Sequence, residues 1–299
     1  MDVAITGASG LIGTALSASL RADGHRVVTV SRSASAGDTV RWDPSTGTIE
    51  SGGLEGLDAV VHLAGEPIAS GAWTKAQRRR IHHSRAQGTR LLATTLAGLD
   101  QKPAVLVSGS AIGAYGDRGD EVMTEASRLG QGFLADVCRE WEAAAAQAGA
   151  AGIRVALART GIVLSAEGGA LAAELPIFRL GLGGRAGKGN QWMSWITLAD
   201  EVAALRFVID HDLSGPVNLT TPAPVTNATF TEALGRALHK RTLLTIPRAV
   251  RRVPFGVGDL VGSLLFASQR VEPTVLVDAG FIFVHTDIDD ALQAIVAKG

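Results

Sequence analysis

TGASGLIG, residues 6–13, is the most informative stretch of this sequence. It follows the short apolar run 2–6, and a helical pattern begins soon after it, over 15–20. Glycines spaced G-x-x-G-x-x-G let the backbone turn sharply and approach a pyrophosphate without a clash at Cβ. The start of the following helix then presents unpaired N–H groups to the anion. This pattern predicts a dinucleotide site rather than a purely structural turn, with Gly7, Ser9, Gly10 and Gly13 in the segment that binds the nucleotide.

Apolar runs alternate with helical patterns along much of the chain. The runs typical of buried strands are 2–6, 26–31, 39–42, 58–63, 104–108 and 153–159. The helical patterns cover 74–99, 133–147 and 199–211. Strands that are apolar throughout and alternate with helices form a parallel sheet covered on both faces. The predicted fold class is therefore α/β, a Rossmann-type doubly wound parallel sheet with a smaller C-terminal substrate lobe.

The rhythm of the sequence changes after Leu164. Residues 181–191 are rich in glycine and have little periodicity, which suits either a loop beside a ligand or a flexible surface turn. Helical patterns return over 227–238 and 287–297. We predict a nucleotide-binding domain over 1–225, of which 168–190 contribute to the substrate lobe, and a smaller C-terminal lobe over 226–299.

Composition excludes several classes of protein. Among the 299 residues, 46% are hydrophobic and 19% charged, which excludes a disordered chain. The net charge of −1 provides no overall positive field for nucleic acid or an anionic membrane, and the longest apolar run, 253–267, is too short to span a bilayer. The single cysteine, Cys138, excludes an intramolecular disulfide and a multi-cysteine metal site. We expect a cytoplasmic protein, either a monomer or an oligomer, with a small-molecule substrate and no metal, nucleic-acid or membrane partner.

The end of the run 26–31 indicates which nucleotide binds. A site for NAD commonly has Asp or Glu there, to bind the 2′-hydroxyl of the ribose. This chain has Ser31 and Arg32 instead, and the nearest carboxylate belongs to Asp38. A hydroxyl and a guanidinium suit a 2′-phosphate, which arginine binds through charge-assisted hydrogen bonds. We therefore predict NADP(H) as the cofactor, the alternative being an arginine that is merely solvated.

A second contact to the cofactor is expected after the run 58–63. Leu63, Ala64 and Gly65 place small or apolar residues where the nicotinamide ribose or a phosphate would pass. His62 ends the buried run just before them. A lone histidine in such a position is interpreted as a core residue rather than a ligand.

These features resemble the extended short-chain dehydrogenase/reductase superfamily, whose fold is that of sugar-nucleotide epimerases. Nearly the whole chain is similar to an atypical, epimerase-like subfamily with a small C-terminal domain, here beginning near Ile246. The segments that carry the narrower resemblance are SGSAIGAYG (108–116), FLADVCREWEAAA (133–145), RTGIVLS (159–165), FRLGLGG (178–184), QWMSWI (191–196) and 214–238. The resemblance implies that Gly7, Gly10, Leu11 and Ile12 hold the pyrophosphate, Ser31 and Arg32 the 2′-phosphate, and Leu63 and Ala64 the nicotinamide side, with Arg85 as a further cofactor contact.

The usual catalytic pair of this superfamily is missing. Active members use Tyr-x-x-x-Lys, in which the lysine lowers the pKa of the tyrosine that transfers a proton. The only tyrosine here is Tyr115, and Gly119 stands four residues on. Alignment on Glu142, which follows the pair in the family pattern, puts Leu134 and Cys138 at the two positions. Neither can perform that proton transfer, and Cys138 is interpreted as a small core residue.

Three hydroxyl groups are the remaining candidates at the end of the run 104–108. Ser110 lies where the resemblance places a catalytic serine, and Ser108 shares its face of a strand and is predicted to contact the cofactor. Tyr115 follows in a glycine-flanked loop, at the sheet edge where ligands bind. We predict Ser110 as a hydrogen-bond donor to a substrate carbonyl and Tyr115 as an acid. The alternatives are a serine that caps a turn and a tyrosine that only packs.

Substrate contacts are predicted at Glu66, Trp192 and Trp195. Glu66 follows Gly65 and is the nearest carboxylate that could act as an acid or a base. One of the two tryptophans is expected to reach a pocket, since residues three apart on a strand face opposite sides. Phe178 and Lys188 are weaker candidates. Three functions remain open: an NADP-dependent oxidoreductase or epimerase with an unusual proton donor, a non-catalytic NADP(H)-binding or redox-sensing protein, and an interaction scaffold, which the glycine motif disfavours.

Overall fold

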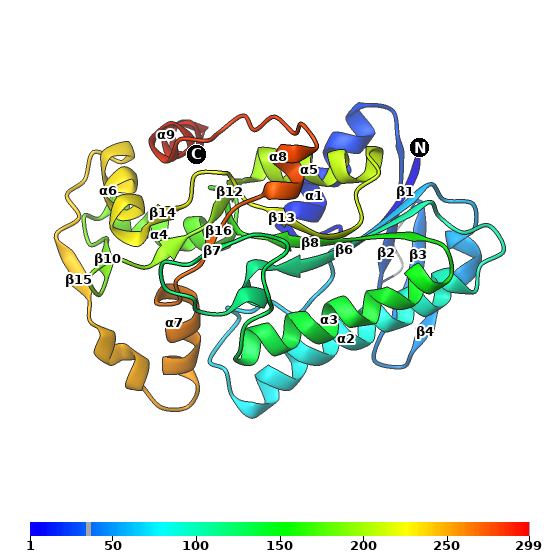
Figure 1. Cartoon of the computed structure of the whole chain (residues 1–299), viewed down its shortest axis with the longest axis horizontal. Coiled ribbons are helices and arrows are strands. Elements are labelled where there is room, and N and C mark those ends of the chain that lie inside the picture. The colour runs from blue at the N-terminus through cyan, green and yellow to red at the C-terminus, as the bar shows by residue number, and fades with distance from the viewer. Residues whose placement is uncertain (34–36, 299) are drawn as a thin grey trace.

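The apolar runs form one eight-stranded sheet in the computed structural model, which describes residues 1–33 and 37–298 (Figure 1). Its strands are β1 (Asp2–Thr6), β2 (Arg26–Ser31), β3 (Thr39–Asp43), β4 (Thr48–Ile49), β5 (Ala59–His62), β6 (Val105–Ala111), β8 (Arg154–Thr160) and β13 (Gly215–Leu219). Their order across the sheet is β13-β8-β6-β5-β1-β2-β3-β4, and only β4, at one edge, runs antiparallel to its neighbour. The order proceeds outward from β1 in both directions, so the predicted doubly wound sheet is confirmed.

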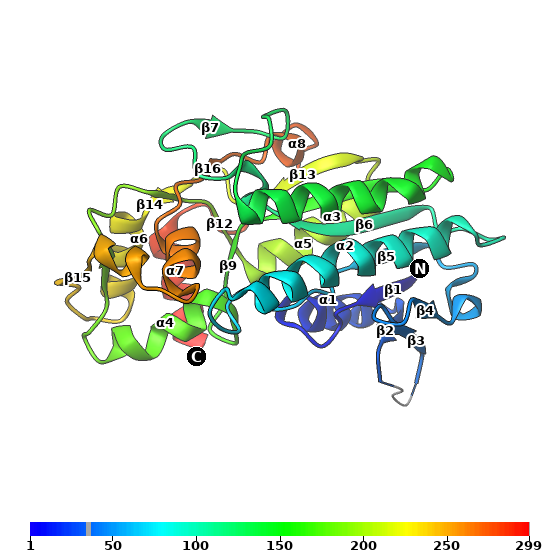
Figure 2. The same ribbon diagram turned by 90° about the horizontal axis from the view of Figure 1, so that it is seen from below.

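Helices cover both faces of this sheet. Helices α1 (Leu11–Ala22) and α5 (Leu198–Asp210) contact each other on one face. Helices α2 (Lys75–Ala97) and α3 (Phe133–Ala150) lie side by side on the other (Figure 2). Thr74 and Thr197 begin α2 and α5 by accepting a hydrogen bond from the backbone N–H three residues on, which explains why these helices start where the sequence indicated.

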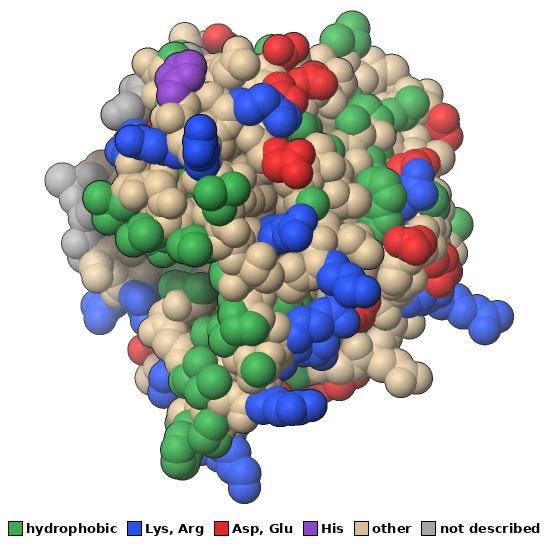
Figure 3. All heavy atoms as spheres, turned by 90° about the vertical axis from the view of Figure 1, so that its left-hand side faces the viewer, with side chains coloured by type: hydrophobic (Ala, Val, Ile, Leu, Met, Phe, Trp, Pro, Cys, Tyr) green, Lys and Arg blue, Asp and Glu red, His purple; other side chains and the backbone are tan. Residues whose placement is uncertain are grey.

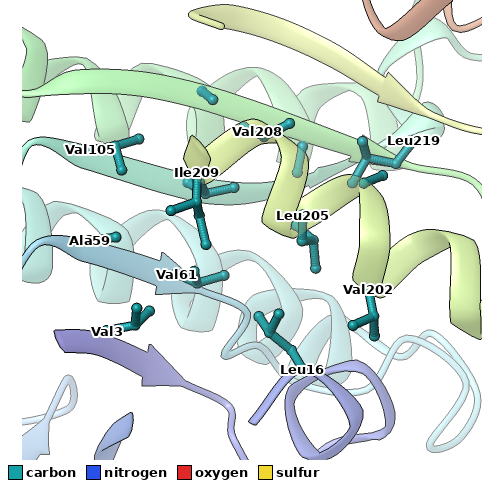
Figure 4. Packing of buried hydrophobic residues seen from close by; sticks show 14 of the residues in the cluster. Val3, Leu16, Ala59, Val61, Val105, Val202, Leu205, Val208, Ile209 and Leu219 are labelled. Carbon is teal, nitrogen blue, oxygen red and sulfur yellow. The ribbon is translucent and has the colours of Figure 1, made fainter. Parts of the chain in front are cut away.

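Alternation along the strands divides the core into two layers. In β1, Val3 and Ile5 belong to the layer under α1 and α5, whereas Ala4 belongs to the layer under α2 and α3. Figure 4 shows the first layer, in which α5 lies across the central strands. Its labelled residues are Val3, Leu16, Ala59, Val61, Val105, Val202, Leu205, Val208, Ile209 and Leu219. Each buried side chain of this size contributes about 1.5–3 kcal/mol, so the sheet forms a rigid support for the loops at its edge.

The smaller lobe lies beyond the carboxyl ends of the strands (Figures 1 and 2). A separate hydrophobic cluster joins helices α4 (Gly169–Arg179), α6 (Asn227–Ala237) and α9 (Ile288–Lys298), with Leu171, Phe230 and Leu292 among its buried residues. Helix α7 (Val257–Leu265) completes the lobe. The short strands outside the main sheet are β7 (Val122–Met123), β9 (Ile162–Leu164), β10 (Gly184–Ala186), β11 (Trp192–Met193), β12 (Trp195–Thr197), β14 (Val225–Thr226), β15 (Leu244–Ile246) and β16 (Arg270–Val271).

Two elements of the lobe differ from the sequence-based expectation. Helix α4 occupies 169–179, where no helix was expected. Pro176 lies inside this helix, and proline disfavours a helix interior because it lacks the backbone N–H donor. The sequence of α4 therefore does not show a clear helical pattern. The glycine-rich stretch 181–191 contains strand β10, which pairs with β15, so it is not loop throughout. The apolar run 253–267 forms α7. No helix in the described ranges is long and apolar enough to cross a bilayer.

The chain after residue 226 contacts both parts of the molecule. Helix α8 (Thr274–Asp278) packs Leu276 against the layer under α1 and α5, together with Phe281 and Phe283. The Asp200 carboxylate accepts hydrogen bonds from the backbone N–H groups of Val284 (2.8 Å) and His285 (3.1 Å). Helix α9 then returns to the lobe. The domain boundary predicted at 225/226 stays a prediction.

Candidate functional site

The packing at the glycine loop between β1 and α1 leaves no room for a side chain at Gly7 or Gly13. Gly7 has a φ of +69°, and a Cβ on it would lie 2.8 Å from the carbonyl carbon of Leu63. A Cβ on Gly13 would lie 2.2 Å from the carbonyl oxygen of Gly7. Both clashes are with backbone, which cannot swing aside as a side chain can. Glycine is therefore required at both positions, as a loop that must approach a pyrophosphate demands.

The first turn of α1 is open to an anion. Gly10 is its N-cap, no side chain caps the helix, and its first turn contains no acidic residue. Ser9 and Gly10 are exposed, so the positive end of the helix dipole faces accessible space. Leu11 packs against the start of α4, since a Cβ on Gly168 would lie 3.4 Å from its Cδ1. The smaller lobe thus borders the glycine loop directly.

Thr6 connects the glycine loop to the end of β5. Its Oγ1 accepts hydrogen bonds from the N–H groups of Leu63 and Ala64, both at 3.1 Å, and lies 2.7 Å from Nδ1 of His62. Nε2 of His62 is 2.9 Å from Oγ1 of Thr89. Burial lowers the pKa of His62 to about 4, so its ring is neutral at physiological pH. The structure thus places His62 in the core, as the sequence indicated, and brings residues 63–65 beside the glycine loop.

Arg32 leaves the end of β2 without a charge partner. It is exposed and makes no ion pair with the residues that the structure describes. The nearest carboxylate in the sequence, Asp38, is bound instead by Arg26 at 2.8 Å, and this guanidinium lowers the pKa of Asp38. The Ser31 hydroxyl accepts a hydrogen bond from the N–H of Ser33 (3.3 Å). The end of β2 therefore offers a cation and a hydroxyl, and the acid that could bind a ribose is already engaged.

Arg85 lies behind the turn that follows β5. Its Nη1 donates to the carbonyl oxygen of Glu66 (2.9 Å), and its guanidinium lies 5.0 Å from the ring centroid of Trp141. A Cβ on Gly65 would lie 3.2 Å from Cζ of Arg85, so this turn rests on the arginine. The side chain is largely buried, and desolvation lowers its pKa. In this arrangement Arg85 positions the turn 63–66 from α2.

A buried network of hydrogen bonds joins the ends of β6, β8 and β13. Oγ of Ser110 donates to Oε1 of Glu142 (2.6 Å), and Nε and Nη2 of Arg159 bind the two oxygens of the same carboxylate, both at 2.8 Å. Nη1 of Arg159 donates to the Tyr115 hydroxyl (2.9 Å), which donates to Oδ1 of Asn218 (2.7 Å). Both members of the ion pair are below 10% exposed, so this is a desolvated, bidentate contact.

This network occupies both predicted catalytic hydroxyls. Tyr115 is fully buried, and desolvation raises the pKa of its phenol. Ser110 gives its one hydroxyl proton to Glu142. Ser108 is fully buried and makes only a long contact, 3.4 Å, with the Gly109 carbonyl. The roles predicted for Ser110 and Tyr115 therefore require them to exchange these partners for a substrate.

An apolar wall stands at the two positions where the superfamily has tyrosine and lysine. Leu134 of α3 packs in a cluster with Ile68, Phe133 and Leu260 of α7. Cys138, one turn further along α3, places its Sγ 3.8 Å from the carbonyl oxygen of Ala111 at the end of β6. Burial raises the pKa of this thiol to about 11, so it stays protonated and unreactive. The expectation of a core cysteine is confirmed.

The predicted substrate residues are spread over the site. Oε1 of Glu66 accepts from Nε2 of Gln77 (3.3 Å) and lies 3.5 Å from Nε of Arg80. Trp195 is fully buried in the lobe, with Nε1 bonded to the carbonyl of Ala223 (3.0 Å). Trp192 is half-buried and donates a hydrogen bond to Asp120. Of the weaker candidates, Phe178 belongs to the lobe core and Lys188 is exposed.

Trp192 is held between two polar neighbours. Its Nε1 donates to Oδ1 of Asp120 (2.9 Å), and the Arg270 guanidinium lies 4.5 Å from its ring centroid. Only Trp192 of the two tryptophans thus has accessible ring surface.

Sequence reasoning missed the residues at the centre of the buried network. Glu142 served only as an alignment marker, and Arg159 and Asn218 were not singled out. A signal for Arg159 was present, since an arginine ending the apolar strand 153–159 must find a partner. Asn218, near the end of β13, carries the same signal. The sequence does not show which side chains Arg159 and Asn218 bind.

Comparisons with known proteins place this geometry in context. The model of the NAD dependent epimerase/dehydratase family matches residues 3–220, and that of a domain of unknown function, DUF1731, matches residues 247–295. The chain is 46% identical to epimerase family protein Mb2239 of Mycobacterium bovis, over 97% of this chain and 96% of that one. It is 32% identical to epimerase family protein YfhF of Bacillus subtilis, over 99% and 98%. The crystal structure of human epimerase family protein SDR39U1 (isoform2) with NADPH is 31% identical, covers 100% of both chains and superposes with a TM-score of 0.90.

Proposed function

Because the chain belongs to the NAD dependent epimerase/dehydratase family, we propose that it binds NADP(H) in the glycine loop and exchanges hydride with a small carbonyl or alcohol substrate. The nucleotide supplies or accepts the hydride when bound. Gly7 and Gly13 leave the backbone free to approach the pyrophosphate, and the uncapped start of α1 faces its charge. With one cysteine, which is buried, the chain suits a reducing compartment, and we place it in the cytoplasm.

The observation that carries this proposal is the unpaired Arg32 at the end of β2. Arg32 and the Ser31 hydroxyl suit a 2′-phosphate, while Asp38, the nearest acid, is held by Arg26. The human relative that covers the whole chain was crystallised with NADPH, which supports the same choice of nucleotide.

We expect wild-type protein to bind NADPH at least about tenfold more tightly than NADH, a difference of roughly 1.4 kcal/mol. Arg32→Asp should abolish or reverse this preference, because a carboxylate repels the 2′-phosphate and accepts from the 2′-hydroxyl. Fluorescence titration with both nucleotides measures the effect. Arg90→Asp, the same charge change at an exposed position of α2, is the control. Equal affinities for the two nucleotides in wild-type protein would contradict the proposal.

The proton route is the unusual part of the proposed chemistry. Leu134 and Cys138 cannot replace the tyrosine and lysine, so the polar groups at the end of β6 are the candidates. We propose that Ser110 turns its hydroxyl from Glu142 to a substrate carbonyl, and that Tyr115 is the nearest acid in the same network. The neighbouring wall of Leu134, Ile68 and Leu260 favours a substrate with apolar surface beside the reacting carbon. Without a lysine to lower the pKa of Tyr115, turnover should be slow.

A non-catalytic NADP(H) sensor is the second candidate. The observation in its favour is that both hydroxyls already have protein partners in the buried network. Oxidation of NADPH by a panel of aldehydes and ketones separates the two functions. We expect slow turnover whose kcat/KM falls at least about tenfold in Ser110→Ala and in Tyr115→Phe, with NADPH affinity unchanged. Full activity in both variants would place the reaction elsewhere, and no turnover with any carbonyl would leave the sensor.

A further inference from the structure

Two segments far apart in the sequence form one surface at the end of the smaller lobe. Residues 177–189 include the end of α4 and strand β10, and residues 239–257 include strand β15 and the start of α7. The strands pair in parallel, with Gly184 opposite Leu244 and Ala186 opposite Ile246. The N–H of Gly187 extends the pairing to the carbonyl of Ile246 (2.8 Å). We call the exposed side chains of these two segments the basic apolar face.

The charge carried by the two segments themselves has one sign, and the exposed Glu232 of α6 lines the same surface hollow as Lys240 and Arg241. The two segments contain eight lysine and arginine residues and no aspartate or glutamate. All eight are exposed, and none forms an ion pair within the described part of the chain. In contrast, nine arginines outside these segments do form ion pairs. The eight cations are Arg179, Arg185, Lys188, Lys240, Arg241, Arg248, Arg251 and Arg252.

The same face exposes an unusual amount of apolar surface. It holds nine of the fifteen exposed large hydrophobic side chains in the described ranges. Phe255 is 85% exposed and has a φ of +62°, a strained backbone for a side chain of this size. The next residue, Gly256, fixes the turn by accepting a hydrogen bond from the N–H of Trp73 (3.1 Å). The nine are Ile177, Leu180, Leu182, Leu243, Leu244, Ile246, Val253, Phe255 and Val257.

Figure 3 looks at this end of the molecule. Many hydrophobic and basic side chains lie in the left and lower parts of the view, and most acidic ones lie in its upper and right parts, beside further basic and hydrophobic ones. The whole chain has a net charge of −1, so residues outside the two segments carry −9 against the +8 of this face. The balanced total that predicted no anionic partner therefore conceals a strong separation of charge.

We propose that the basic apolar face docks the protein on the surface of an anionic lipid bilayer. Cations at such a surface are attracted by the anionic headgroups, and aliphatic or aromatic side chains are stabilised by entering the acyl boundary. No spanning helix is needed, because the protein lies on the membrane. This proposal replaces the expectation, drawn from composition, that the chain has no membrane partner.

Two other occupants fit the face less well. A second copy of the chain in a two-fold contact would bring eight cations against eight cations, with no acid in the two segments to pair them, which costs free energy. Nucleic acid would satisfy the cations but not the exposed leucines, since its single strands are bound on aromatic faces and this face has one aromatic ring, Phe255. Of these three occupants, only a lipid surface provides anionic groups and an apolar layer together.

The test is sedimentation of the full chain with vesicles. We expect it to bind vesicles of phosphatidylcholine mixed with phosphatidylglycerol, to bind phosphatidylcholine alone weakly, and to be released by salt. Lys240→Glu with Arg241→Glu should weaken binding at least about tenfold. Leu243→Ser with Phe255→Ser, which leaves charge unchanged, should also weaken it. Arg90→Glu with Arg128→Glu, an equal charge change at exposed positions elsewhere, is the matched control and should bind as wild type does.

Two further measurements keep the outcome decisive. Unfolding curves and NADPH affinity, unchanged in every variant, exclude misfolding as the cause of lost binding. Sedimentation equilibrium without lipid reports the oligomeric state. The proposal is overturned if wild-type protein ignores anionic vesicles, or if Leu243→Ser with Phe255→Ser binds them fully and heparin competes, which indicates a polyanion partner. It is also overturned if those serine substitutions instead convert a dimer to a monomer.

Discussion

Replacement of Glu142 by leucine is expected to lower the free energy of unfolding by about 3–5 kcal/mol. The carboxylate accepts two hydrogen bonds from Arg159, both at 2.8 Å, and one from Ser110 at 2.6 Å. Its loss leaves the Arg159 guanidinium, 5% exposed, as an uncompensated charge inside the protein. Tyr115 stays neutral there, because desolvation raises its pKa, so it cannot take over as the counter-ion. Urea denaturation followed by circular dichroism measures the change.

Two companion variants test the reason for this loss. Glu140→Leu, in the same helix, removes only a half-exposed carboxylate beside His82 and should cost less than about 1 kcal/mol. Glu142→Leu combined with Arg159→Met removes both charges and should recover much of the stability, since a buried ion pair replaced by apolar residues is often near neutral. If the double variant is less stable than the single one, uncompensated charge is not the cause.

Replacement of Gly13 by alanine is expected to weaken NADPH binding by at least about a hundredfold, roughly 2.7 kcal/mol. The new Cβ would lie 2.2 Å from the Gly7 carbonyl oxygen and 2.8 Å from Cα of Ala8, so the loop that faces the pyrophosphate must move away from α1. Isothermal titration with NADPH measures the effect, alongside a thermal unfolding curve that shows whether the chain still folds.

The controls use glycines with different surroundings. Gly52→Ala, where a Cβ meets nothing within 4 Å, should leave NADPH affinity unchanged. Gly10→Ala brings a Cβ to 3.3 Å from the same Gly7 oxygen and should give an intermediate loss, which serves if Gly13→Ala does not fold. Wild-type affinity in a folded Gly13→Ala protein would show that the glycine loop does not bind the nucleotide.

The large sheet could be predicted from the sequence because its strands are buried on both faces. Val3, Ala4 and Ile5 are all apolar since each side of β1 meets a helix layer, and this leaves a continuous run in the sequence. The strands of the smaller lobe do not produce a continuous apolar run in the sequence. Strands β10 and β15 are three residues long, and β15 is exposed along its whole length, so neither shows a periodicity that could be recognised.

The candidate site could be predicted where position along a strand was sufficient. Gly7, Arg32 and Leu63 each follow directly after a recognisable strand. Because the carboxyl ends of parallel strands lie at the same edge of the sheet, the sequence alone indicated that these three residues are neighbours. The partners of Ser110 and Tyr115 could not be predicted this way. Glu142 comes from a helix and Asn218 from a strand 103 residues beyond Tyr115, and only the folded chain shows that they meet. The tyrosine that seemed available in the sequence is therefore fully buried in the structure.

The hydrophobic core shared by α4, α6 and α9 can be completed only when the end of the chain has been synthesised. Leu171 and Phe178 leave the ribosome more than a hundred residues before Leu292, which packs in the same cluster. The strands of the sheet, which end at Leu219, emerge well before that. The nascent protein therefore passes through a stage in which the sheet is assembled while the apolar side of α4 is still exposed to solvent. Of the three helices, α4 is synthesised first, so its apolar side is available to chaperones for the longest time. This exposure ends when α9 has been synthesised and packs against the lobe.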